Sequence, residues 1–445
     1  MSAASDRPQT VVVGGGLAGI TCALHLADRG HQVTVLERAP ALGGLCRSVA
    51  DPTVGRVDTG QHVYLGCCSH LEGLLARLGV RPALRQRRLE LAVADPATGL
   101  TRALRAGPLP APLHLLPVLA RWPGLGPRAL VDARRVASSL KDGGVSDLDD
   151  VPALGWLQSL GQSQAMIERL WEPFLVAACN LALAECSAAS AAQVISEGLL
   201  GSGSSAALRV PGEDLTAWLG PPALRQLEAM GVTVRLRFRV KGIRHQDGGL
   251  VAFDEAGTEV PGNRVVLATR ANHARIMLSQ GGMEDEGLNR ASEIPDSPIV
   301  NVHLFTNRPF LPHPIVVVPR SPLQWLFDRS ALNPSEGQRD NLFHSAISIS
   351  AAREEVAIAE DRLINMMWEL CRSVFPAAAR TRLLGARVTR EAHATFAPVA
   401  GSAACRPGPT TALPGILVAG SWTATGWPAT MEGAVRSGEA AAQAA

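Results

Sequence analysis

The residues near the start of the chain that could do chemistry are three glycines and one acid with the spacing of a dinucleotide site. Gly14, Gly16 and Gly19 form G-x-G-x-x-G after a short apolar run, and apolar residues then recur at helical spacing. Such glycines let the backbone turn tightly, approach a pyrophosphate and pack a helix closely on a strand. A second strand over 32–36 ends at Glu37, whose carboxylate can accept hydrogen bonds from ribose hydroxyls. This stretch predicts a β-α-β unit that binds a dinucleotide.

The continuation of this unit separates FAD from NAD. The segment 37–44 resembles the E-R-x-x-x-x-G-G extension of the FAD-dependent amine oxidase and phytoene desaturase superfamily. The resemblance implies FAD, held non-covalently because no His or Cys occupies a position that it marks as flavinylated. The expected cofactor contacts are Gly14, Gly16, Leu17, Ala18, Gly19, Glu37, Arg38, Gly43, Gly44, Arg47, Gly60, Gln61, His62, Val240, Gly420, Ser421, Thr430, Met431 and Ala434.

Two later motifs belong to the same expected site. In the superfamily the D-x-G loop that begins at Asp58 passes the flavin face, so Gln61 and His62 are active-site candidates. A hydrogen-bonded loop histidine is an equally good interpretation of His62. Near the end of the chain, 415–423 predicts a buried strand, and a helix begins at or just after Pro428. The N-terminal dipole of that helix would stabilise the anionic edge of a reduced flavin.

Composition bounds the class of protein. The chain has 445 residues, 47% hydrophobic and 18% charged, which is ordinary for a globular protein with a large core. A formal net charge of +2 gives no reason to expect a nucleic-acid partner. The eight cysteines lack C-x-x-C spacing, no metal site is expected, and the N-terminal residues lack an apolar signal region, which predicts a reduced, cytoplasmic protein. No apolar run approaches the roughly 20 residues that span a bilayer.

The order of the expected strands and helices predicts an α/β fold. We expect a Rossmann-like FAD-binding domain of the amine oxidase and glutathione reductase-like type, with an inserted mixed α+β, helix-rich substrate domain. The FAD-binding domain is assigned to 1–70, 205–275 and 395–445, and the substrate domain to 71–204 and 276–394. Residues 69–204 predict mainly helices, and 232–243 predicts one strand. Residues 276–394 predict a mixed sheet over the substrate site, with strands near 300–305, 315–318, 323–327 and 343–349, and a helix around 360–374.

One stretch of the substrate domain combines apolar and basic residues. Between Arg77 and Arg135 eleven arginines stand against three acidic residues, an excess of +8. Within this block 109–122 is an apolar, proline-broken segment that contains Trp122. Apolar surface, tryptophan and flanking arginines suit a membrane interface, and a buried core segment is an equally good interpretation. The expectation is a cytoplasmic protein that docks peripherally on the inner face of the cytoplasmic membrane.

Motifs in order along nearly the whole chain carry a closer resemblance. They are 58–66, 109–115, 171–173, 324–329, 394–396 and 423–438. They resemble the squalene-associated FAD-dependent proteins, the hydroxysqualene dehydroxylases, which implies reduction of hydroxysqualene to squalene by FADH₂ in bacterial squalene and hopanoid biosynthesis. Two positions depart from that pattern: Ser421 replaces an Asp in a late A-G-D-W-T motif, and Leu45 replaces an arginine, with Arg47 two positions on. These departures put the tightness of FAD binding in question.

The implied reaction requires a proton donor and an apolar, water-excluding pocket. An acid would protonate the allylic hydroxyl while the developing cation accepts hydride from reduced FAD. Candidates for the acid are His62, Glu172 and His393, each also explicable as a structural residue. Candidates for a polyisoprenoid-binding wall are Trp171, Asn180, Trp325, Phe396, Trp422 and Trp427. No second nucleotide fingerprint indicates what reduces the flavin, so an external reductant of unknown identity is expected.

Three other functions remain compatible with these motifs. A carotenoid desaturase of the phytoene type also acts on a long polyisoprenoid. A flavin amine oxidase shares the fold, although a pair of tyrosines beside the flavin cannot form because the chain contains only Tyr64. A prenyl-lipid escort uses the same fold without catalysis, and such a protein need not keep a complete set of phosphate-side glycines.

Overall fold

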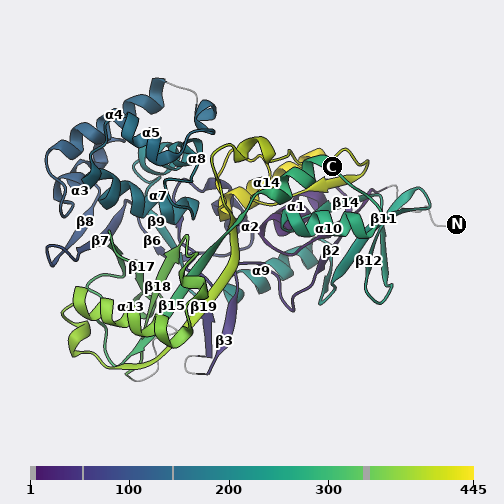
Figure 1. Cartoon of the computed structure of the whole chain (residues 1–445). Helices are drawn as coiled ribbons and strands as arrows, with labels where there is room; N and C mark the ends of the chain where they lie inside the picture. Colours follow the sequence, from purple (N-terminus) through teal and green to yellow (C-terminus); the bar gives the residue numbers. More distant parts are fainter. Residues whose placement is uncertain (1–6, 53–54, 143–144, 334–340) are drawn as a thin grey trace.

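The computed structural model describes residues 7–52, 55–142, 145–333 and 341–445. Figure 1 shows two regions, one around a parallel sheet with the C-terminal helix, the other around a mixed sheet with helices above and below it. No helix within the described ranges combines the length and the apolar character needed to cross a membrane. The α/β class expected from the sequence is confirmed.

The first region is organised around a parallel sheet of five strands. Their order is β10 (Thr233–Leu236), β2 (Gln32–Glu37), β1 (Gln9–Val13), β14 (Arg264–Leu267) and β20 (Ile416–Val418). Neighbouring strand residues point to opposite faces, so Val12 packs against one apolar cluster while Val11 and Val13 pack against another. Both faces are covered, as parallel sheets require.

Helices cover one face of this sheet and a second sheet covers the other. The helical face is formed by α1 (Leu17–Asp28), α2 (Ser69–Arg77), α9 (Leu215–Ala229) and α14 (Met431–Ala444). The other face carries β11 (Val240–Gln246), β12 (Gly249–Asp254), β13 (Glu259–Gly262) and α10 (Ala271–Gln280), followed by α11 (Glu286–Glu293). Helices α1 and α14 approach so closely that a Cβ at Gly438 would meet the carbonyl oxygen of Ala18.

The single strand expected over 232–243 is wrong, because the chain makes two strands there in different sheets. β10 extends the parallel sheet, whereas β11 begins an antiparallel one. Between them Arg237 has φ 59°, a left-handed conformation that interrupts the extended backbone. The amide of Phe238 donates to the carbonyl of Glu37, so this turn is tied to the end of β2.

The second region is built on a mixed sheet of seven strands. Their order is β19 (Leu383–Phe396), β15 (Asp296–Thr306), β18 (Phe343–Ser350), β17 (Gln324–Asp328), β16 (Ile315–Val318), β7 (Glu90–Asp95) and β8 (Leu100–Arg105). One face packs on α13 (Glu360–Val374), which lies below the sheet in Figure 1. The other face packs on the helices of 113–200. Since β7 pairs with β16, both inserted segments contribute to one sheet.

The helices above this sheet follow the expected segments with interruptions. They are a 3₁₀ turn Leu113–Leu115, α3 (Leu116–Arg121), α4 (Arg128–Asp142), a 3₁₀ turn Val145–Leu148, α5 (Ala153–Ser159), α6 (Gln164–Met166), α7 (Glu172–Cys179) and α8 (Ala188–Gln193). Two π-helical segments, Ile167–Trp171 and Val194–Leu200, join or extend them. The smaller elements are α12 (Arg329–Leu332) and the 3₁₀ turns Glu355–Ala357, Ala378–Arg380 and Ser402–Cys405.

The expectation that 69–204 is mainly helical overlooked its strands. β6 (Pro82–Arg85), β7 and β8 occupy 82–105, and β6 pairs with β9 (Leu208–Pro211), which also pairs with β5 (Tyr64–Leu65). The 14-residue strand β19 was not predicted either, because its apolar and polar residues do not alternate regularly and only three of its residues are buried. A hairpin of β3 (Ser48–Asp51) and β4 (Gly55–Asp58) leads into the expected flavin loop.

A buried ion pair connects the two regions. Arg329 Nη2 at the start of α12 lies 3.0 Å from Asp58 Oδ2 at the end of β4, and each side chain is 3% exposed. Ser48 and the amide of Leu215 also donate to this carboxylate. The carbonyl of Asp58 accepts from Nε2 of His303 at 3.0 Å. The residues just before the flavin loop are thus fixed from both regions.

Replacing Arg329 by Met should destabilise the protein strongly. The change leaves a buried carboxylate without its cation, which typically costs about 3–5 kcal/mol. Urea unfolding measures the loss, and Arg353→Met is the matched control because the Arg353–Glu185 pair is exposed and such pairs contribute at most about 1 kcal/mol. Equal losses in the two variants would contradict a central role for the buried pair.

Candidate functional site

Two glycine turns face each other beside β1 and form a groove. Gly14 has φ 113°, and a Cβ there would overlap the carbonyl oxygen of Ala268. Gly44 has φ 61°, and its Cβ would lie 2.9 Å from the Cα of Gly16. The amide of Gly43 donates to the carbonyl of Gly15, which holds the turns together. The groove is therefore lined by bare backbone next to the start of α1, where unpaired N–H groups suit a pyrophosphate.

Glu37 is positioned for the ribose by hydrogen bonds to the backbone. Its side chain is buried, with Oε2 accepting from the amide of Gly15 at 2.6 Å and Oε1 from the amide of Ala39 at 2.7 Å. Each oxygen retains a lone pair for a ribose hydroxyl. Arg38 is exposed, and Val240 is buried at the start of β11. These residues fit the nucleotide half of FAD.

The N-terminus of α14 lies in the same region. Thr430 caps the helix by accepting from the amide of Gly433 at 3.2 Å, and Met431 and Ala434 are half-buried. The carboxylate of Glu432 is fully buried and accepts from the amide of Leu71 in α2 and from Arg436. Because the Glu432 carboxylate is bonded to α2 and Arg436, it does not occupy the N-terminal N–H groups of α14. The positive end of the helix dipole can therefore act on an anionic flavin edge.

Arg406 organises the loop before α14, although no motif in the sequence indicates it. The guanidinium donates to the carbonyls of Ser421, Thr423 and Trp427 at 3.1, 2.6 and 2.8 Å. It also lies 4.9 Å from the ring centre of Phe396. Burial lowers the pKa of Arg406 to about 10, so it stays charged at neutral pH. The half-buried Ser421 is thus fixed by the hydrogen bond from Arg406 to its carbonyl, and Gly420 is fixed by the bond from its amide to the hydroxyl of Ser437.

The loop 58–62 is anchored from the seven-stranded sheet. The carbonyl of Thr59 accepts from Nδ2 of Asn301 at 2.9 Å and from the hydroxyl of Thr389 at 3.3 Å. His62 Nδ1 lies 3.3 Å from the carbonyl oxygen of Gly60, and burial lowers the pKa of the His62 imidazole. The Gln61 Nε2 atom is buried without a hydrogen-bond partner in the described part of the chain.

The other two acid candidates lie in contact with solvent. Glu172 is exposed, and partial desolvation and the nearby Glu168 carboxylate raise its pKa. His393 is 52% exposed and pairs with Asp296 at 2.6 Å. Arg47, expected at the cofactor, forms an exposed ion pair with Glu391. Glu172 and His393 are therefore not shielded from water, as a proton donor to a cationic reaction must be, and His62 is the remaining candidate for the acid.

The expected substrate wall is only partly brought together. Trp325 packs edge-on against Phe174 on the sheet face that contacts the helices. Trp171 lies in the helical core, where Nε1 donates to Gln162. Asn180 caps the C-terminus of α7 with φ 52°. Its Nδ2 donates to the carbonyl of Ser297 and the hydroxyl of Thr395, and its Oδ1 accepts from the amide of Ala351, so its side chain has a structural role.

The remaining aromatic candidates pack inside the first region. Phe396 lies beneath Arg406, and Trp422 Nε1 donates to the carbonyl of Thr269 at 2.8 Å. Trp427 lies 4.7 Å below the guanidinium of Arg436. Each ring therefore has a packing role that explains its burial without a substrate. No group of His, Cys, Asp or Glu among the described residues is placed to hold a metal ion.

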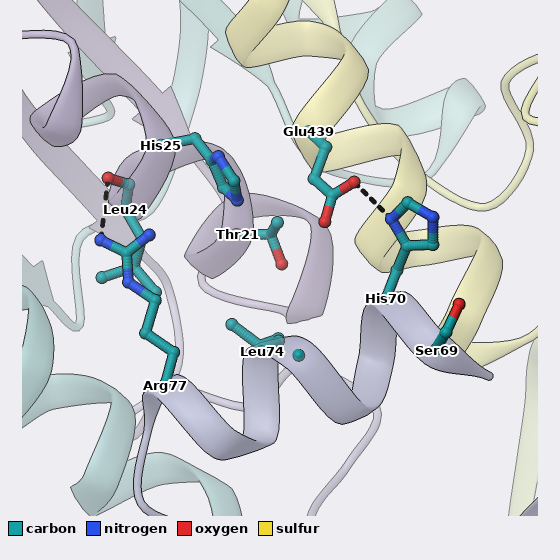
Figure 2. A pocket seen from close by; sticks show the side chains of 9 residues that line it. Thr21, Leu24, His25, Ser69, His70, Leu74, Arg77 and Glu439 are labelled. Carbon is teal, nitrogen blue, oxygen red and sulfur yellow. Dashed lines mark hydrogen bonds and ion pairs between the residues drawn. The ribbon is translucent and has the colours of Figure 1, made fainter. Parts of the chain in front are cut away.

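A separate pocket of about 390 Å³ opens between α1, α2 and α14. Figure 2 shows His70 facing Glu439 across it, with Nδ1 and Oε2 2.6 Å apart, and Arg77 bound to the carbonyl of Leu24. The lining includes none of the motif glycines. This pocket is therefore distinct from the nucleotide groove, and its main charged groups are already paired.

Gly16→Val should yield a folded protein without flavin. Gly16 has φ −81°, which any residue adopts, and a Cβ there would meet only the Cα of Gly44, 3.7 Å away, among the described residues. The added side chain would therefore occupy the groove itself and not the protein core. Absorbance of the acid supernatant measures released flavin, and circular dichroism checks the fold. Gly126→Val, in open space, is the control that should stay yellow; normal flavin in Gly16→Val would contradict this placement.

Comparison with known proteins agrees with this geometry. The family model described as flavin containing amine oxidoreductase matches residues 17–445. A cyclohexylamine oxidase from Brevibacterium oxydans has a similar structure, with a TM-score of 0.72, 18% identity and 98% coverage of both chains. At that identity the likeness concerns the fold.

Curated relatives narrow the position within this family. The hydroxysqualene dehydroxylase of Rhodopseudomonas palustris is 31% identical, with 97% of this chain and 96% of the relative covered. The 15-cis-phytoene desaturase of Solanum lycopersicum is 24% identical over 99% of this chain and 79% of its own length. The chain therefore belongs to the flavin-containing amine oxidoreductase family, as an FAD-dependent oxidoreductase of the hydroxysqualene dehydroxylase group.

Proposed function

We propose that this enzyme reduces hydroxysqualene to squalene in bacterial squalene and hopanoid biosynthesis. The observation that carries the proposal is the 31% identity, over 97% of the chain, with a hydroxysqualene dehydroxylase. The bare backbone at Gly16 and Gly44 and the buried carboxylate of Glu37 support it, because these features fit the pyrophosphate and ribose of FAD. The electrons come from an external reductant.

The proposed reaction is balanced by one hydride and one proton. The allylic C–O bond breaks, the oxygen leaves as water and a C–H bond forms at the same carbon. Bound reduced FAD supplies the hydride from N5 and becomes oxidised. The protein must deliver the proton to the leaving oxygen and keep other water away from the cationic carbon.

His62 is the residue we assign to the proton transfer. It lies in the loop that continues from Asp58, and burial lowers the pKa of its imidazole, so its protonated form gives up a proton readily. The apolar wall comes from the sheet face on which Trp325 packs against Phe174 and Phe327.

A phytoene-type desaturase is the second candidate, favoured by the 24% identity with the tomato desaturase. Both candidates need a long apolar substrate channel. They differ in the direction of electron flow, because a desaturase reduces its flavin with the hydrocarbon, whereas a dehydroxylase oxidises reduced flavin with the alcohol.

We also propose that the enzyme docks on the inner face of the cytoplasmic membrane. A leucine patch of Leu109, Leu113 and Leu116 is 50%, 49% and 39% exposed. Exposed Arg105 and Arg121 belong to β8 and α3, which lie together at the left edge of Figure 1. Apolar side chains with arginines on neighbouring elements complement an anionic lipid surface, and each such cation contributes up to about 1 kcal/mol.

The apolar segment does not present all the residues expected of it. Trp122 is 1% exposed and belongs to the helical core, and Leu115 is half-buried against the same core. Leu115 ends the 3₁₀ turn before α3 and Trp122 directly follows α3, and both side chains pack against the core between the sheet and the helices. The docking surface is therefore confined to the leucine patch.

Anaerobic mixing of photoreduced enzyme with hydroxysqualene should reoxidise the flavin and produce squalene. The rate should fall as the pH rises through the lowered pKa of His62, because the proton donor is then lost. Stopped-flow absorbance and gas chromatography follow flavin and product, and His62→Gln is the matched variant. Silence with hydroxysqualene, together with flavin reduction by phytoene in the oxidised enzyme, would favour the desaturase.

Replacing Leu109, Leu113 and Leu116 by Ser should abolish binding to anionic liposomes. Wild-type binding should require anionic lipid and weaken with salt, because the arginines are screened. Co-sedimentation measures it, and the control is Ile276→Ser with Leu384→Ser, which changes aliphatic side chains exposed elsewhere at 41% and 43%. Unchanged binding by the folded triple variant would exclude the leucine patch.

A further inference from the structure

Two buried polar atoms beside the flavin loop lack hydrogen-bond partners in the described chain. They are Oδ1 of Asn301 and Nε2 of Gln61. Asn301 is 0% exposed, and its Nδ2 already donates to the carbonyl of Thr59, two residues before Gln61, which fixes the direction of Oδ1. Buried polar groups are nearly always hydrogen-bonded, so an unpaired acceptor and an unpaired donor on neighbouring segments indicate a missing polar ligand.

A third unpaired group stands next to Asn301 on the sheet. Ser348 of β18 is directly opposite Asn301 of β15, so the two side chains share one face with their Cβ atoms about 5 Å apart. Ser348 is half-buried, and its hydroxyl has no partner among the described residues. On the other side of Ser348, the residue directly opposite on β17 is Trp325. Asn301, Ser348 and Trp325 therefore lie side by side across three strands, and Trp325 belongs to the apolar cluster on this face.

We infer that Asn301 and Ser348 bind the hydroxyl group of the substrate and orient its C–O bond toward the loop of Gln61 and His62. The inference rests on the proposed function and names the residues that recognise the alcohol. Asn301 Oδ1 accepts the substrate O–H, and Ser348 donates to the substrate oxygen, beside the Nε2 donor of Gln61. The isoprenoid chain then extends from this point along the wall of Trp325.

This arrangement distinguishes substrate from product. A hydrocarbon leaves Oδ1 of Asn301 and the hydroxyl of Ser348 unpaired in a desolvated site, and that penalty is larger than the net gain of an ordinary hydrogen bond. A site built to pair with a hydroxyl therefore rejects the analogue that lacks it. Once the C–O bond has broken and water has left, squalene is held more weakly, which favours its release.

The test compares dissociation constants of oxidised enzyme for hydroxysqualene and squalene in detergent, followed by the flavin spectrum. Wild type should prefer the alcohol by about tenfold or more, the equivalent of at least one hydrogen bond. Ser348→Ala and Asn301→Leu should each lower this ratio by about fivefold or more, because each variant weakens binding of the alcohol and removes the penalty of an unpaired polar group against squalene. Ser348 makes no side-chain hydrogen bond within the described chain, so Ser348→Ala should fold normally. This variant therefore still tests the inference if Asn301→Leu misfolds.

Thr389→Val is the matched control. Thr389 stands directly opposite Asn301 on β19 and anchors the same loop through the carbonyl of Thr59, without an unpaired atom. Its loss should leave the preference for the alcohol intact, so a general loosening of the loop is separated from loss of recognition. An equal fall of the ratio in Thr389→Val would overturn the assignment.

The remaining outcomes separate this inference from the proposed function. Turnover of hydroxysqualene by wild type, with the preference for the alcohol retained in Ser348→Ala and Asn301→Leu, overturns only the inference. Wild type that turns over hydroxysqualene without preferring it to squalene also overturns only the inference. Wild type that neither binds nor turns over hydroxysqualene overturns the proposed function, and the inference with it.

Discussion

The buried ion pair between Asp58 and Arg329 is the interaction on which the rest of the site depends. Both charges are out of water, a state that is tolerated only when each has a close partner and further hydrogen bonds. Asp58 ends the hairpin of the FAD-binding region, whereas Arg329 begins α12 of the mixed sheet. Their pairing therefore fixes the two regions against each other at Asp58, the first residue of the flavin loop 58–62.

Neutral groups surround this pair and extend it across the sheet. Burial and the neighbouring His344 lower the pKa of His303 far below its ordinary value, so its ring is neutral, donates from Nε2 to the carbonyl of Asp58 and accepts from His344 at Nδ1. Asn301 and Thr389 bind the next carbonyl along the loop. A loop with such anchors keeps Gln61 and His62 in one place, as a reaction that needs an oriented proton donor requires.

The proposed cofactor side and the proposed substrate side differ in chemistry. The features that fit FAD are the glycine turns around Gly16 and Gly44, the Glu37 carboxylate held by two amides, and a loop whose carbonyls bind the guanidinium of Arg406. On the proposed substrate side, Asn301 and Ser348 lie on a sheet face that also carries His303, His344 and Thr389, whose side chains already bond to one another or to the loop, and it continues into the aromatic side chains of Trp325 and Phe327. Hydrogen bonds from a few polar groups act strongly where water does not compete.

The sequence by itself determined the features that depend on local spacing. The glycines, Glu37 and strand periodicity predicted the dinucleotide unit, because each of these requirements is met within about 30 consecutive residues. A helix around 360–374 and a strand near 315–318 were also predicted from local pattern, and both are confirmed as Glu360–Val374 and Ile315–Val318. Only the tertiary structure decided which distant residues meet: that Arg329 pairs with Asp58, that Arg406 gathers the loop before α14, and that Asn301 faces the flavin loop. It also placed Trp171 and Trp122 in the core and His393 in solvent. An arginine in a loop or an asparagine in a strand carries no local signal of its partner. The partner lies 21 residues away for Arg406 and Trp427 and 242 residues away for Asn301 and Thr59, and in both cases it is set by how sheets, helices and loops pack.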